Sequence, residues 1–288
     1  MKTSKILVRL SILIVLLSLI AAGAGVFWQG EGSSYEFTSL RDETVMIHGQ
    51  GLYRYDSVSY AAQAIAQDVV TIVVGVPLLV VGIMLYRKGS LRGQLLLTGT
   101  LGYMLYTYTS YTFLSAYNEL FLLYVALFSL SLFTFILAMI NLNPEKIRQQ
   151  ISKGFPRRGI AIFLWVIAGF LTLAWLGRIV PPLIAGEPPL GLESYTTLVI
   201  QALDLGIIVP ISTLTATLLW KEQPWGYALS AVVLIKGLTM GAALVAMIIG
   251  LILAGEPVNL VEIIMFSGIA LAALIFTLLL FRSVQKPN

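Results

Sequence analysis

The sequence contains no cysteine, a single histidine and few charged residues. Of its 288 residues, 11% are charged and 58% are hydrophobic, and the mean hydropathy is +0.90. Because soluble globular domains carry about 25% charged residues, this composition excludes a soluble enzyme, a nucleic-acid-binding protein and a disordered chain. The lack of cysteine excludes disulfides, thiolate metal ligands and cysteine nucleophiles. With one histidine, any metal site would need mostly carboxylate and carbonyl ligands, and we expect neither a metal nor another cofactor.

Long apolar runs take up most of the chain. A hydrocarbon core about 30 Å thick requires about 20 apolar residues in a helix. Eight stretches meet this requirement, namely residues 10–28, 66–86, 93–115, 119–140, 159–180, 197–219, 225–253 and 259–281. Membrane-spanning strands would alternate between apolar and polar residues, and these runs do not. The sequence therefore predicts an all-α integral membrane protein, a single domain of eight transmembrane helices over residues 1–288, embedded in a lipid bilayer.

Lysine and arginine are distributed unevenly between the predicted connections. All but four of the 18 basic residues lie at the two termini or in the even-numbered connections. The exceptions are Arg41, Arg54 and Arg178 on the opposite side and Lys236 within a span. Because cytoplasmic loops carry the excess of basic residues, we predict a plasma-membrane protein with both termini in the cytoplasm.

The first apolar stretch has two interpretations. Lys2, Lys5 and Arg9, followed by apolar residues and the small residues 21–25, are also typical of a cleaved signal peptide. The apolar stretch continues through Trp28, however, which makes it long enough to cross a membrane. We therefore favour an uncleaved membrane anchor.

Residues 29–65 form the only sizeable polar segment of the chain. Residues 35–39 and 44–48 flank a polar turn, which predicts a short β-hairpin. An isolated hairpin is marginally stable in water, so we expect it to pack on the outer ends of the helices. His48 lies in this hairpin without other metal ligands at a suitable spacing, and we interpret it as an ordinary loop histidine.

The two halves of the chain share a sequence pattern. Residues 51–55 and 191–195 each begin with Gly-Leu and end with Tyr, and each precedes a span that contains an aspartate and then a proline. These pairs are Asp68 with Pro77 and Asp204 with Pro210. The pattern predicts two parallel four-helix repeats, residues 1–143 and 151–288, as in transporters whose sites lie between the halves. The spacings differ, and all these residue types are frequent in membrane helices, so a chance origin stays open.

Two ionisable residues lie deep in the predicted spans. Asp204 lies roughly 12 Å below the outer end of the sixth span, and Lys236 lies roughly 17 Å above the cytoplasmic end of the seventh. Consecutive spans are usually neighbours, and an unpaired charge at mid-depth costs about 2.5–3.5 kcal/mol. We therefore expect the two side chains to pair. Such a pair either fixes the register of the helices or forms a site for a substrate or a proton.

Four charged residues are predicted near the outer face. Asp68, Glu119 and Glu262 would form an acidic vestibule around Arg178, which would concentrate cations or, through the guanidinium, bind a carboxylate or phosphate. The alternative is that each is an ordinary interfacial residue.

The third span is rich in tyrosine and threonine. Tyr103 and Tyr106 lie near its middle, where interfacial aromatic belts do not explain them. Thr100, Tyr103, Thr107 and Ser110 share one helix face. This face indicates either an interhelical hydrogen-bond seam or the lining of a cavity that holds an aromatic or cationic solute.

Pro77 and Pro210 interrupt two of the predicted spans. Each proline removes a helix hydrogen bond and frees the carbonyl four residues earlier, that of Val73 or Gly206. The Gly206 carbonyl beside Asp204 would suit a bound cation. The alternative is a simple proline kink.

Several segments of the sequence resemble segments of a known class of membrane proteins. Residues 89–93, 117–118, 201–206 and 224–227 look like segments of multi-span prokaryotic membrane proteins without an assigned activity. The resemblance extends over much of the chain. It implies no chemistry and transfers no functional residue.

Three functions fit these observations. The one we favour is a transporter of a small solute or cation, with its site between helices near Asp204 and Lys236. The second is an outer-leaflet membrane enzyme that uses the carboxylates near Arg178. The third is a non-catalytic sensor or a partner subunit, because the sequence contains no phosphate-binding loop, ATPase signature or metal motif.

Overall fold

A computed structural model describes residues 3–28 and 30–285, most of which are helical. The helices are α1 (Lys5–Phe27), α2 (Val58–Val70), η1 (Thr71–Gly75), α3 (Val76–Arg87), α4 (Leu91–Leu114), α5 (Phe121–Ile140), α6 (Pro144–Gln150), α7 (Arg157–Ala185), α8 (Val199–Leu203), η2 (Asp204–Ile208), α9 (Val209–Trp220), α10 (Pro224–Leu253) and α11 (Leu260–Ser283). The strands are β1 (Tyr35–Thr38) and β2 (Thr44–Ile47).

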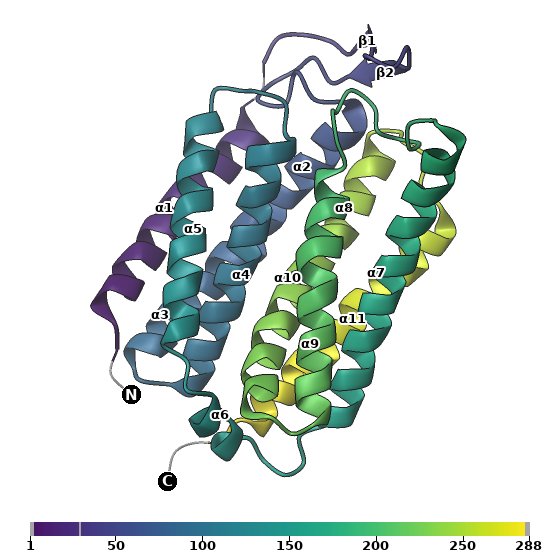
Figure 1. Ribbon diagram of the computed structural model, residues 1–288. Helices are drawn as coiled ribbons and strands as arrows, with labels where there is room; N and C mark the ends of the chain where they lie inside the picture. The colour runs from purple at the N-terminus through teal and green to yellow at the C-terminus, as the bar shows by residue number, and fades with distance from the viewer. Residues whose placement is uncertain (1–2, 29, 286–288) are drawn as a thin grey trace.

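The long helices stand side by side in one bundle (Figure 1). The first group consists of α1 to α5, and the second group consists of α7 to α11. The hairpin covers one end of the bundle, which we call the hairpin end. Both ends of the described chain lie at the opposite end, which we call the terminal end, together with the short helix α6.

Seven helical stretches in the described chain are long and apolar enough to cross a membrane. They are Lys5–Phe27, Val58–Arg87, Phe121–Ile140, Arg157–Ala185, Val199–Trp220, Pro224–Leu253 and Leu260–Ser283. The prediction of a multi-span helical membrane protein is thus confirmed, whereas the count of eight is not. The stretch predicted at residues 93–115 forms the 24-residue helix α4, which is too polar to qualify. It packs on α3, α5 and α10, and most of its residues are buried.

Polar side chains at the helix starts explain several boundaries. The hydroxyls of Ser4, Ser57 and Ser90 accept hydrogen bonds from the first-turn N–H groups of α1, α2 and α4, and Asn259 caps α11 in the same way. Such caps satisfy donors that a helix start leaves unpaired. These four helices therefore begin where a short polar residue precedes an apolar run.

The predicted hairpin is present at the hairpin end. Strands β1 and β2 are antiparallel, with Tyr35 opposite Ile47 and Thr38 opposite Thr44. Val45 and Ile47 are buried, and the Arg41 guanidinium at the tip of the hairpin donates hydrogen bonds of 2.8 and 2.6 Å to the backbone carbonyls of residues 193 and 195. These contacts attach the hairpin to the loop between α7 and α8, so it does not stand alone in water.

Two membrane helices are interrupted by a π-helical turn. In η1 the N–H of Val76 bonds to the carbonyl of Thr71, and in η2 the N–H of Val209 bonds to the carbonyl of Asp204. Each π-turn inserts an extra residue just before Pro77 or Pro210, and so accommodates a residue that has no N–H to donate. Each proline therefore follows a π-turn, and the simple proline kink considered from the sequence is not what the structure contains.

The segments around the two π-turns match at a constant spacing. Pro210 follows Pro77 by 133 positions, and Gly226 follows Gly93 by 133 positions. A Cβ at Gly93 would collide with the backbone of residues 85 and 86, and a Cβ at Gly226 would collide with the backbone of residues 218 and 219, which are again 133 positions apart. The turns before α4 and α10 also correspond, because Gly89 and Glu222 both have positive φ angles.

The buried apolar side chains form two clusters, one within the first helix group and one that joins the second group to Leu95 of α4. The first includes Leu79, Leu101 and Leu127 from α3, α4 and α5. The second includes Leu164 and Leu234 from α7 and α10. Helix α10 of the second group packs on α2 and α4 of the first, so the two groups are joined along this helix.

Candidate functional site

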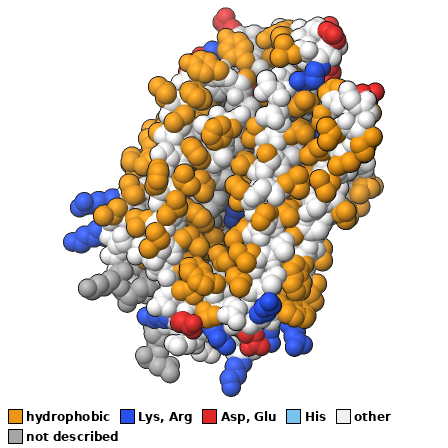
Figure 2. Space-filling view, viewed as in Figure 1, with side chains coloured by type: hydrophobic (Ala, Val, Ile, Leu, Met, Phe, Trp, Pro, Cys, Tyr) orange, Lys and Arg blue, Asp and Glu red, His pale blue; other side chains and the backbone are white. Residues whose placement is uncertain are grey.

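A cavity of about 1040 Å³ lies between the two helix groups. Its walls come from α2, α4 and α5 of the first group and from α7 to α11 of the second. On α10 the lining extends from Leu229 to Leu251, which is roughly 33 Å of helix at 1.5 Å per residue. The cavity is therefore about as long as the hydrocarbon core of a bilayer is thick. Figure 2 shows the furrow between the groups, bordered by hydrophobic side chains, with a basic side chain at depth.

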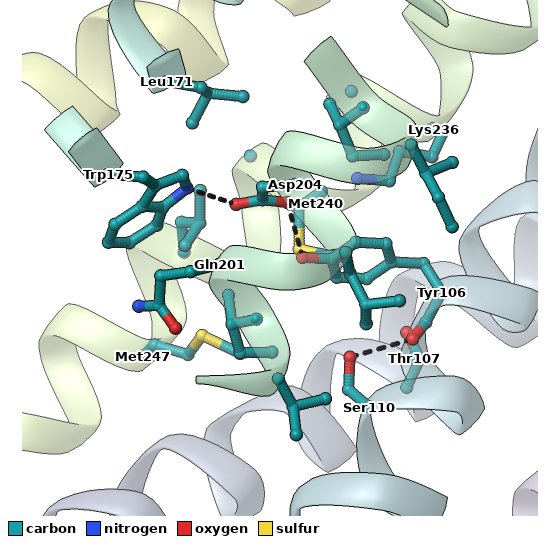
Figure 3. A pocket seen from close by; sticks show the side chains of 18 of the residues that line it. Tyr106, Thr107, Ser110, Leu171, Trp175, Gln201, Asp204, Lys236, Met240 and Met247 are labelled. Atoms are coloured by element: carbon teal, nitrogen blue, oxygen red, sulfur yellow. Dashed lines mark hydrogen bonds between the residues drawn. The ribbon is translucent and has the colours of Figure 1, made fainter. Parts of the chain in front are cut away.

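Asp204 is the polar centre of this cavity. It is the first residue of η2, it is buried, and its two carboxylate oxygens have different donors (Figure 3). The Tyr106 hydroxyl from α4 donates to Oδ1 at 2.7 Å, and the Trp175 indole N–H from α7 donates to Oδ2 at 3.0 Å. Two donors from two other helices thus satisfy a carboxylate that would be costly to bury alone.

Lys236 faces the same cavity from α10. Its ammonium nitrogen lies 3.9 Å from the centroid of the Tyr106 ring, a cation–π distance. Among the described residues, no oxygen lies within hydrogen-bonding or ion-pairing distance of this nitrogen, so the direct pair with Asp204 that the sequence suggested is not formed. Tyr106 contacts both side chains, the carboxylate through its hydroxyl and the ammonium through its ring face.

Arg178 and Glu262 line the part of the cavity toward the hairpin end. The Arg178 guanidinium donates to the backbone carbonyls of Leu190 and Gly191 at 2.8 to 3.1 Å. Glu193, which the sequence analysis did not single out, lines the cavity next to them, and burial raises the pKa of its carboxyl. This end of the cavity therefore combines one guanidinium with two carboxyl groups.

Asp68 lies outside the cavity, in a sealed cluster of the first helix group. It accepts hydrogen bonds from the Tyr53 hydroxyl at 2.5 Å and the Tyr111 hydroxyl at 3.0 Å. A side chain at Gly25 of α1 would collide with this carboxylate, so the glycine provides the space for it. Asp68 is therefore a buried, satisfied carboxylate that does not line the cavity.

Glu119 lies at a third place, on the surface of the hairpin end. It forms an exposed ion pair with Arg54, and this hydrogen bond lowers the pKa of Glu119. The four charged residues predicted near the outer face thus divide among three locations. Asp68, Glu119 and Glu262 do not share one site, as an acid–base enzyme would require.

Tyr103 belongs to a hydrogen-bond seam between α2, η1 and α4. Its hydroxyl accepts a hydrogen bond of 2.7 Å from the Gln67 amide, which also donates to Thr107, and it lies 2.9 Å from the Thr71 hydroxyl. Tyr106, one helical turn further along α4, faces the cavity instead. The polar face of this helix thus forms a hydrogen-bond seam at Tyr103, and its Thr107 and Ser110 line the cavity.

Trp175 is the functional residue that the sequence analysis missed. It lies roughly 15 Å before the end of α7, far from the interfacial positions that tryptophan usually occupies. A tryptophan this far from the end of an apolar stretch is the sequence feature that could have identified it. Gly206, by contrast, is exposed and does not line the cavity, so its carbonyl is not part of this site.

The described residues contain no group of three or more histidine, aspartate or glutamate side chains placed to hold a metal ion. No family model matches the chain, and no curated protein or solved structure matches it either. The function therefore has to be inferred from the cavity and from the charged side chains that face it.

Proposed function

We propose that the protein transports a small solute or ion through a site between its helices near Asp204 and Lys236. The observation that carries this proposal is a cavity about as long as the bilayer core is thick, with an acid and a base facing it at mid-depth. Ionisable groups inside a membrane protein are costly, and they mark substrate and proton pathways. A location between two helix groups is also typical of transporter sites.

We also propose that α4 crosses the membrane, which brings the number of spans to eight. With 24 residues it is roughly 36 Å long, and its polar side chains are buried against neighbouring helices and away from lipid. Basic residues gather at the terminal end, including Arg92, Arg148, Arg158 and Lys221. From the positive-inside rule we propose that this end lies in the cytoplasm, and we propose the plasma membrane as the location.

The constant spacing of 133 residues supports a parallel duplication of residues 1–143 and 151–288. At this spacing, Thr71 and Tyr103 of the first half correspond to Asp204 and Lys236 of the second. The first pair forms a direct hydrogen bond of 2.9 Å in a buried seam, whereas the second pair is charged and faces the cavity. The corresponding positions are therefore uncharged and buried in the first half, and charged and exposed to the cavity in the second half.

The position of Asp204 in a π-turn supports a moving site. A π-turn inside an α-helix is a frequent feature of functional sites, because one inserted residue can shift along the helix. Such a shift in η2 would move the carboxylate away from Tyr106 and Trp175. Broken helices at mid-membrane are also how many transporters form their sites.

A first experiment tests transport directly. Proteoliposomes are exposed to jumps in proton, sodium, potassium, chloride and phosphate concentration, and to amino acids, while charge movement is recorded on a solid-supported membrane. We expect a transient current that Asp204→Asn abolishes. Asp68→Asn is the matched control, because it changes a buried carboxylate with two donors outside the cavity. An unchanged current in folded Asp204→Asn would contradict the proposal.

A second experiment tests whether the cavity opens to both sides. Because the chain has no cysteine, Gly237→Cys provides a single thiol on the cavity wall, where nothing lies within 4 Å. We expect a membrane-impermeant methanethiosulfonate to label it from both sides of oriented vesicles. Gly169→Cys is the control, since it is exposed on α7 outside the cavity and faces lipid, where thiols react poorly. Labelling from one side only would argue against transport.

A further inference from the structure

The walls of the cavity are unsuited to a fully hydrated solute over most of their length. The side chains of Phe135 and Met139 of α5 and of Phe163 and Phe170 of α7 are part of its lining. Polar groups lose hydration without compensation beside such walls. The volume of about 1040 Å³ is also at the upper limit for pockets that hold drug-sized ligands. The shape and chemistry therefore fit a long apolar chain better than a small ion alone.

The cavity is open on its flank, toward the region that lipid occupies. Ile207 of η2 lines the cavity and is 55% exposed, and the furrow between the helix groups is visible on the surface in Figure 2. Helix α5 packs on α1 and α4, and α9 packs on α7 and α10, which leaves the furrow of Figure 2 between the two groups. A molecule dissolved in the bilayer can reach the cavity by this route without crossing water.

The ammonium group of Lys236 is the unsatisfied partner in the cavity. Its three N–H donors have the Tyr106 ring on one side and no oxygen acceptor among the described residues. Each carboxylate oxygen of Asp204, in contrast, already accepts a hydrogen bond, from Tyr106 or from Trp175. The group left for a ligand is therefore positive, and an anionic oxygen would complete it.

We propose that the occupant is an anionic lipid that enters from the bilayer, with its carboxylate or phosphate on Lys236 and its hydrocarbon chain between α5 and α7. This inference rests on the proposed transport function and replaces the small solute or ion by a lipid at the same site. The anion would therefore come from the membrane. The test below distinguishes it from a free anion that enters from water.

The test measures lipid binding to the delipidated full-length protein in detergent by native mass spectrometry. The probes are dioleoyl phosphatidic acid, dioleoyl phosphatidylcholine and inorganic phosphate. We expect the phosphatidic acid to bind at least tenfold more tightly than the phosphatidylcholine, and inorganic phosphate not to compete. Lys236→Gln should weaken binding of the phosphatidic acid about tenfold, Lys236→Arg should retain it, and Lys221→Gln, at the terminal end, should leave it unchanged.

A second pair of variants tests the location of the chain. Gly237→Leu adds a side chain to the cavity wall at a position with nothing within 4 Å, so it fills the cavity without disturbing the fold. Gly169→Leu makes the same change in equally open space outside the cavity. We expect only Gly237→Leu to weaken binding of the phosphatidic acid.

Two results would overturn the inference. One is equal binding of the two lipids, or binding of the phosphatidic acid that neither Lys236→Gln nor Gly237→Leu changes. The other is binding of inorganic phosphate that depends on Lys236 while the lipid does not bind. In that second case the substrate is a water-soluble anion, and the transport proposal survives. The transport proposal itself would be contradicted by a separate observation, an unchanged current in Asp204→Asn.

Discussion

The hydroxyl of Tyr106 donates a 2.7 Å hydrogen bond to the carboxylate of Asp204, across the contact between α4 and η2. The ring of the same tyrosine lies 3.9 Å from the ammonium of Lys236. One side chain from the first helix group therefore contacts both charges of the second group. This indirect arrangement leaves the ammonium available to a ligand, which a direct ion pair would not.

Tyr106→Phe should separate the two roles of this side chain. The variant keeps the ring near Lys236 but leaves Oδ1 of Asp204 without its donor, which should lower stability by about 1–3 kcal/mol. We expect the transport current of Tyr106→Phe to be smaller than that of the wild type as well. Tyr106→Leu also removes the ring, and we expect a further loss of about 1–2 kcal/mol. Denaturation in mild detergent measures both variants, and equal stabilities for Phe and Leu would contradict the cation–π contribution.

Asp56 should make the stability of the hairpin end depend on pH. It lies before α2, outside the membrane spans, and accepts hydrogen bonds from the Ala116 N–H and the hydroxyl of Tyr195, which lines the cavity. Burial raises the pKa of Asp56 to about 7 from 3.8. Between these two values the folded protein binds more protons than the unfolded chain, so stability should fall as pH rises from about 4 to 7 and level off above.

The measurement is the melting temperature between pH 4 and pH 8. Asp56→Asn should flatten this dependence, because its side chain cannot ionise but still accepts the two hydrogen bonds. Glu187→Gln, at an exposed position of the loop between α7 and α8, should leave the wild-type dependence in place. Parallel curves for wild type and Asp56→Asn would exclude Asp56 as the origin of the effect.

Gly93→Ala and Gly226→Ala should destabilise the protein to a similar degree. In each case the new methyl group would collide with the backbone of the preceding helix at a matching place in the two halves. Overpacking of this kind costs about 1–3 kcal/mol. Gly177→Ala, in a helix with open space around it, should instead be neutral or stabilising by up to about 1 kcal/mol. Thermal unfolding compares the three, and an effect at only one of the first two would argue against equivalent packing.

Arg54→Ala should have little effect on either stability or transport. The ion pair with Glu119 is exposed, with about a third of the arginine side chain and 43% of the glutamate side chain open to solvent. Exposed pairs of this kind contribute about 0–1 kcal/mol. Because Glu119 does not line the cavity, Glu119→Gln should also leave the transport current intact. A large loss of current in either variant would show that the site extends to the hairpin end surface.

The helices, the hairpin and the buried charges could all be predicted from the amino-acid sequence. A membrane helix depends on about 20 consecutive apolar residues and on local caps, all of which are read along one segment. Asp204 and Lys236 were recognisable for the same reason, because a charge inside an apolar run is costly wherever that helix packs. The same argument does not apply to helix α4. Its polar residues are buried by neighbouring helices, which cannot be read from its own composition.

Which of these residues share a site could not be predicted from the sequence and depends on how the helices pack. Tyr103 and Tyr106 are three positions apart on one helix, yet the first lies in a seam with Gln67 and the second faces the cavity. Asp68 and Asp204 are both aspartates in membrane helices, yet one is sealed and one is open to the cavity. A cavity exists where helices from distant parts of the chain leave space between them. That depends on packing between segments, which the local cost of inserting each helix does not specify.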